Sequence, residues 1–145
     1  MKKNAVCIVT PHFPGPMHCG GIGTAVYWQA LALAEAGIQV TVFYTGHIYI
    51  ETPAYWAQKL KKEHGIEFVG AADWIHKNRT QLRTRKYAPQ FDELIYAQWV
   101  FEFLQTRNFE VVYLQDYQGH GIRALQAKKA GIAFGQTQFV LTLHG

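Results

Sequence analysis

Three short segments of the chain are rich in groups that could bind a polar ligand. The first contains Gly20, Gly21 and Gly23, with His18 before them and Thr24 after them. Glycines let a ligand approach the backbone closely, and the free N–H groups of a helix that begins there favour an anion such as a diphosphate. Thr24 can cap such a helix or hydrogen-bond beside it. The alternative is a tight turn that packs a helix against a sheet.

The other two segments contribute a carboxylate and imidazoles. Asp116, Tyr117 and His120 fall within the run Gln-Asp-Tyr-Gln-Gly-His-Gly at 115–121, and His144 is the penultimate residue. Each has a plainer interpretation: Asp116 as a turn or capping residue, His120 as a loop histidine, and Tyr117 as a packing residue instead of a platform for a sugar. His144 lies so near the end of the sequence that disorder is an alternative there.

The elements that must position these residues alternate between strand and helix. The hydrophobic patterns predict strands at 5–9, 39–44, 66–69, 111–114 and 139–143, and helices at 24–36, 53–64, 91–107 and 122–130. Residues 71–90 give no clear element. The helix at 24–36 is apolar around most of its circumference, so we expect it to be largely buried, with Trp28 and Trp99 as core residues.

This alternation is typical of a doubly wound α/β domain with a mostly parallel, Rossmann-like sheet. In such sheets, ligands bind beyond the carboxyl ends of the strands, where the strand order reverses. With the common order 3-2-1-4-5, that point lies between the first and fourth strands. The glycine segment, the segment at 115–121 and His144 should therefore meet at one edge.

Length and composition favour a single globular domain over a membrane or disulfide-rich protein. The chain has 145 residues, 49% of them hydrophobic, with no apolar run long enough to span a bilayer and no secretory leader. We expect a cytoplasmic protein, with peripheral attachment to a membrane as an alternative. Cys7 is predicted to be buried, and His12, His18 and Cys19 lack the spacing of a zinc site, so no metal is expected.

Positive charge is concentrated in one run. The net charge is +4, and residues 77–86 carry five positive charges and no negative one. A solvated loop is the favoured interpretation, and a patch that contacts an anionic acceptor or an acidic membrane surface is the alternative. No specific nucleic-acid partner is expected, because no recognition module accompanies the run.

Two nucleotide-binding classes are disfavoured by the sequence. The nearest match to the dinucleotide fingerprint, Gly21-x-Gly23-x-x-Val26, lacks the third glycine, and no acidic residue closes the strand that ends at Tyr44. A P-loop is excluded because Gly-Lys-Ser and Gly-Lys-Thr do not occur.

Three motifs together resemble a known family. These are Gly-Gly-Ile-Gly followed by an alanine-rich helix and Ala-Gly-Ile-Gln-Val-Thr-Val at 36–42, then Val-Tyr-Leu-Gln-Asp-Tyr at 112–117, and Leu-Thr-Leu-His-Gly at 141–145. In this order they are similar to the N-terminal domain of retaining glycosyltransferases of family 4, which have the GT-B fold and are distantly related to starch and glycogen synthases. Those synthases carry a lysine where this chain has His18.

The resemblance implies roles for the candidate residues. Gly20, Gly21 and Gly23 would line a cleft near the diphosphate of a nucleotide sugar, His144 would contact the transferred sugar, and Asp116 would orient sugar hydroxyls or nearby loops. The departing phosphate would help to deprotonate the acceptor hydroxyl, so no cofactor and no metal are implied.

The same resemblance implies a two-domain enzyme. Residues 1–145 would form the acceptor-side domain, a fragment without the C-terminal domain that holds the donor, and we expect the fragment alone to be inactive. The alternative is a stand-alone flavodoxin-like domain that binds a phosphate-bearing ligand without catalysis. A weaker alternative is a nucleic-acid binder acting through residues 77–86.

Overall fold

The computed structural model describes residues 4–15, 18, 20–46, 53–78 and 92–144. Its centre is a five-stranded, all-parallel sheet in the order β3-β2-β1-β4-β5. The strands are β1 (Ala5–Thr10), β2 (Gln39–Tyr44), β3 (Glu67–Gly70), β4 (Val111–Gln115) and β5 (Gln138–Thr142). The predicted Rossmann-like α/β class and strand order are confirmed.

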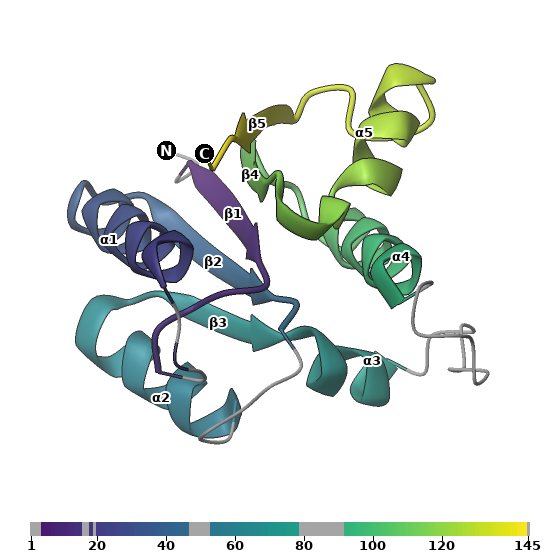
Figure 1. The fold of residues 1–145 in the computed structure, drawn as a ribbon. Helices are drawn as coiled ribbons and strands as arrows, with labels where there is room; N and C mark the ends of the chain where they lie inside the picture. The colour runs from purple at the N-terminus through teal and green to yellow at the C-terminus, as the bar shows by residue number, and fades with distance from the viewer. Residues whose placement is uncertain (1–3, 16–17, 19, 47–52, 79–91, 145) are drawn as a thin grey trace.

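Helices cover both faces of the sheet (Figure 1). Helices α1 (Gly21–Glu35) and α2 (Pro53–His64) lie on one side, and α3 (Ala71–Asn78), α4 (Asp92–Gln105) and α5 (Ile122–Lys129) lie on the other. A single 3₁₀ turn, η2 (Tyr117–Gly119), follows β4. This two-sided arrangement follows from right-handed crossovers between parallel strands.

Alternate residues of each strand belong to two separate hydrophobic cores, one on each face of the sheet. Val6 and Ile8 of β1 pack toward α1 and α2, whereas Cys7 and Val9 pack toward α4 and α5. Because side chains alternate along a strand, this parity assigns every strand position to a face. Cys7 is fully buried, as predicted. Its burial raises the pKa of the thiol far above the ordinary value.

Helix α1 differs from the prediction in its start and in its burial. It begins at Gly21, so the glycine cluster forms its first turn, where Thr24 was expected to be the start. Only one stripe is buried, at Gly23, Val26, Ala30 and Leu31. Trp28 is 63% exposed, so its placement in the core was wrong, whereas Trp99 is 7% exposed and its placement is confirmed. Alanines at the outer positions gave the helix an apolar circumference, although such small side chains tolerate solvent.

The end of α1 is capped as the sequence predicts. Gly37 adopts φ of +81°, and the N–H of Ile38 donates to the carbonyl of Leu33. This is the hydrogen-bond pattern of a left-handed C-terminal cap. The N–H of Gln39 then donates to the carbonyl of Asn4, which places the end of α1 at the amino edge of the sheet.

Helix α3 was not predicted. It begins at Ala71, directly after Gly70, the last residue of β3, so no turn separates the two elements. Trp74 anchors it by edge-on contacts with Phe43 and Phe103. Beyond Asn78, the remainder of the 71–90 region, including most of the basic run at 77–86, lies outside the described residues.

Among the described helices, none combines the length and the apolar character that crossing a bilayer requires.

Candidate active site at the carboxyl edge of the sheet

The N-terminus of α1 lies at the edge where the strands end. The helix ends at the amino edge and has 15 residues, so it extends back by about 22 Å. Gly20 occupies the N-cap position and no side chain caps the helix. The hydroxyl of Thr24 instead donates to the carbonyl of Gly20 at 3.3 Å, one turn inside the helix. The first turn therefore presents backbone N–H groups and the positive end of the helix dipole at this edge.

Packing explains only part of the glycine cluster. Gly23 is buried against the sheet. At Gly20 and Gly21, by contrast, an added Cβ would meet no atom of the described residues within 4 Å, chain neighbours and helix backbone aside, and neither residue has positive φ. Gly121 shows what a packing constraint looks like, because a Cβ there would lie 2.4 Å from Cδ1 of Leu114. The absence of side chains at Gly20 and Gly21 thus leaves open space beside the helix start, as close approach by a ligand requires.

Asp116 and His144 lie side by side. The backbone N–H of Asp116 donates to the carbonyl of Thr142 at 3.1 Å, which extends the ladder between β4 and β5 by one residue. In return, the backbone N–H of His144 lies 3.3 Å from each carboxylate oxygen of Asp116. Asp116 occupies the N-cap position of η2, as the alternative interpretation expected, but its side chain makes no capping hydrogen bond there. The carboxylate instead fixes the backbone at His144.

Gln115 and His12 belong to the same cluster, although the sequence analysis gave them no role in it. Oε1 of Gln115 lies 2.6 Å from Nε2 of His144. The ring of His12 contacts Tyr117 edge-on, with centroids 5.2 Å apart. Desolvation and the nearby charge of His144 both lower the pKa of His12. One signal in the sequence could have revealed His12: both β1 and β5 end in Thr-x-His.

The side chain of His120 is buried at the carboxyl end of the sheet and is not exposed there. It is 3% exposed, stacks on Tyr96, and hydrogen-bonds through Nδ1 to Oγ1 of Thr45 at 2.8 Å. Thr45 directly follows β2, so this pair links the tip of β2 to the segment after β4. We therefore assign His120 a structural part in the edge and not a contact with substrate.

Two further predicted site residues are exposed to solvent. Tyr117 is 45% exposed at the edge, and His18 is exposed ahead of α1. Cys19 lies outside the described residues. In the described part of the chain, no group of three His, Cys, Asp or Glu side chains could hold a metal ion.

The structure therefore brings three of the predicted segments to one edge. His12 after β1, Tyr117 after β4 and His144 after β5 are neighbours, and α1 starts on the same side of the sheet. A positive helix end, two imidazoles and a carboxylate can together bind a ligand that carries both a phosphate and hydroxyls. No metal-binding group of side chains occurs among the described residues of this edge.

Comparison with protein-family models gives one match. The model of the glycosyl transferase 4-like domain matches residues 20–145. The chain belongs to this family. Searches among curated proteins and among solved structures found no significant match. The family match begins at the glycine cluster and includes Asp116 and His144, whereas His12 and His18 lie before it.

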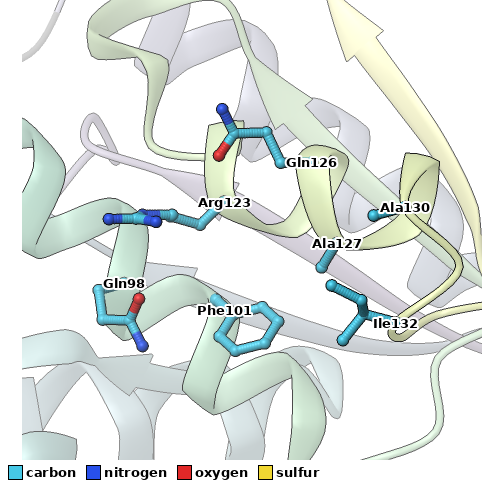
Figure 2. Close-up of a pocket in the computed structure, with 7 residues that line it drawn as sticks. All are labelled: Gln98, Phe101, Arg123, Gln126, Ala127, Ala130 and Ile132. Atoms are coloured by element: carbon cyan, nitrogen blue, oxygen red, sulfur yellow. The ribbon is translucent and has the colours of Figure 1, made fainter.

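A separate groove in the domain lies between α4 and α5 (Figure 2). It has a volume of about 300 Å³ and none of the predicted site residues contributes to it. Its lining comprises Gln98, Phe101, Arg123, Gln126, Ala127, Ala130 and Ile132. The groove is thus a feature of the outer helical layer, distinct from the edge where the strands end.

Proposed function

We propose that this domain is the acceptor-side, N-terminal half of a retaining glycosyltransferase with the GT-B fold. Such an enzyme moves a sugar from a nucleotide sugar to an acceptor hydroxyl. The family match supports the transferase class. The observation that carries the assignment to this edge is the open space at Gly20 and Gly21, at a helix start on the same side of the sheet as the pair of Asp116 and His144.

In this proposal each segment meets a different part of the substrates. The diphosphate approaches the N-terminus of α1, where the backbone N–H groups and the helix dipole stabilise its negative charge. His144 contacts a hydroxyl of the transferred sugar. Asp116 holds the backbone of His144 and so orients the loop around the sugar.

The reaction we propose needs no protein base, cofactor or metal. The acceptor oxygen bonds to the anomeric carbon as the bond from that carbon to the diphosphate breaks, on the same face of the sugar. The acceptor proton passes to the departing phosphate oxygen. Charge that develops on the diphosphate is stabilised by the donors already oriented at the helix start.

We further propose that turnover requires a second, donor-holding domain facing this edge. A chain of residues 1–145 supplies only one wall of such a cleft, so it should bind a nucleotide sugar weakly and transfer nothing. Incubation with uridine diphosphate glucose or guanosine diphosphate mannose and a panel of sugar acceptors should give no product. Measurable transfer by these residues alone would contradict the two-domain proposal.

Binding tests the proposed site directly. Calorimetric or NMR titration with the same two nucleotide sugars should give a dissociation constant on the order of 1 mM for at least one of them. Gly21→Val should weaken that binding at least about tenfold, because its side chain fills the space left for the diphosphate. Gly135→Val is the matched control, since Gly135 is also open but lies before β5 at the opposite edge. Equal effects of the two variants would contradict the assignment of the diphosphate to α1.

A further inference from the structure

Gln115 occupies an unusual position for a polar side chain. It is the last residue of β4, its partner across the ladder is Thr142, and its side chain is 4% exposed. By the alternation of side chains, Gln115 and its partner Thr142 share the face of the sheet that α1 covers, and His144 follows two residues after Thr142. The register of the strands thus places the amide next to the imidazole.

The contact between them determines where the imidazole proton lies. Oε1 of Gln115 is an acceptor only, and it lies 2.6 Å from Nε2 of His144. With the amide in this orientation, Nε2 carries the proton and donates it. In the neutral ring, Nδ1 is then unprotonated and can only accept a hydrogen bond.

Packing alone does not account for an amide at this position. Nε2 of Gln115 is buried and has no hydrogen-bond partner among the described residues. A buried donor without an acceptor is unfavourable, and an apolar side chain of similar size would avoid that penalty. The carbonyl end of the amide, which faces His144, is the part that makes a specific contact.

We propose that Gln115 is a positioning residue that fixes the orientation and the tautomer of His144. Asp116 holds the backbone N–H of His144 and Gln115 holds its ring, so the residue is secured at two points. Nδ1 then accepts a hydrogen bond from a hydroxyl of the substrate, whereas a phosphate oxygen, which has no proton to donate, is a poor partner for it. This assignment of a sugar hydroxyl to His144 rests on the proposed function; the hydrogen bond to Gln115 does not.

The tautomer can be measured on the chain itself. Long-range ¹H–¹⁵N spectra of the histidine-labelled chain at pH 8, assigned with His144→Asn, should show His144 protonated at Nε2 with a proton protected from solvent exchange. Gln115→Leu should abolish the protected signal, and Gln115→Glu, which retains an acceptor oxygen, should restore it. Gln105→Leu, which removes an exposed amide on α4, should leave it unchanged.

Several results would overturn the proposal. These are a proton on Nδ1 of His144 in the unaltered chain, the absence of a protected Nε2 proton there, or persistence of that signal in Gln115→Leu. The position of the His144 proton in the unaltered chain tests the proposal even if Gln115→Leu fails to fold.

Ligand binding separates this proposal from the proposed function. Gln115→Leu should weaken the binding of uridine diphosphate glucose or guanosine diphosphate mannose by roughly fivefold, the effect of losing one oriented hydrogen bond. His144→Asn should weaken it by a similar factor. Failure of the unaltered chain to bind either compound would contradict the proposed function, while the protected Nε2 proton would still establish the positioning role.

Discussion

At the scale of single residues, the binding edge is held together by a few polar contacts among side chains from different strands. Gln115 is the last residue of β4, and Asp116 follows it. Asp116 contacts the backbone N–H of His144, whereas Gln115 contacts its ring. His12 approaches the same histidine from the loop after β1. The charge of His144 therefore contributes to the lowered pKa of His12.

The proximity of His144 to His12 predicts how His12 titrates. Its pKa lies below the ordinary 6.5, first because of desolvation and second because of His144. The unfolded chain therefore binds this proton more readily, so the contribution of His12 to folding stability is present above pH 6.5 and is lost as the pH falls below it.

In His144→Asn, the pKa of His12 should rise toward the ordinary value, because the second cause is removed while desolvation remains. NMR titration of the His12 ring measures this change. His76→Asn, which alters an exposed histidine on α3, is the control and should leave the His12 titration as it was. An unaltered His12 titration in His144→Asn would contradict the placement of the two rings.

Gly21 provides a test in which stability and binding change in opposite directions. Alanine favours helix over glycine by up to about 1 kcal/mol, and a Cβ at Gly21 meets nothing within 4 Å. Gly21→Ala should therefore raise the free energy of unfolding in urea, or leave it unchanged, while it weakens nucleotide-sugar binding. A loss of stability would show instead that the fold itself requires this glycine.

At the scale of elements, the strands and most helices could be predicted because their patterns are local. Buried runs such as Val6 to Val9 indicate strands, and Gly37 predicts the end of α1. The alternation then predicts a parallel sheet and the edge at which ligands bind. The start of α1 was misplaced because glycines favour turns in isolation, and nothing local shows that these glycines lie inside a helical turn.

The parts that could not be predicted depend on contacts between distant segments. The bond between Thr45 and His120 joins positions 75 residues apart, and no spacing in the sequence indicates it. The same holds for Gln115, whose role depends on the register between β4 and β5. Helix α3 was not predicted because Trp74, which anchors it, packs on aromatic residues of β2 and α4 that are distant in the sequence.

The link between Thr45 and His120 should stabilise the edge. Both side chains are nearly fully buried, so Thr45→Val removes one partner of an interior hydrogen bond. The expected cost is about 1–3 kcal/mol of unfolding free energy, measured by urea denaturation. Thr24→Val, which removes an exposed hydroxyl, is the control and should change stability by less than about 0.5 kcal/mol. Similar losses in both variants would argue against a special contribution of the buried pair.

At the scale of the whole molecule, the contacts that stabilise the fold and the polar candidate-site residues lie in different places. Two hydrophobic cores and the contacts of Glu67 with Arg107 and Thr41 near the amino ends of the strands stabilise the fold. The carboxyl edge instead gathers polar side chains and open glycines. The groove between α4 and α5 in Figure 2 lies apart from this edge.

The most direct test is to map where a nucleotide sugar binds. Backbone ¹H–¹⁵N spectra of the labelled chain, recorded during titration with uridine diphosphate glucose and then guanosine diphosphate mannose, report each amide separately. We predict that the shifts of at least one titration are largest at Gly20, Gly21, Tyr117 and His144. Shifts confined to Phe101, Arg123 and their neighbours in the α4–α5 groove, or no shifts up to about 10 mM ligand, would contradict the claim that the strand ends form the substrate site.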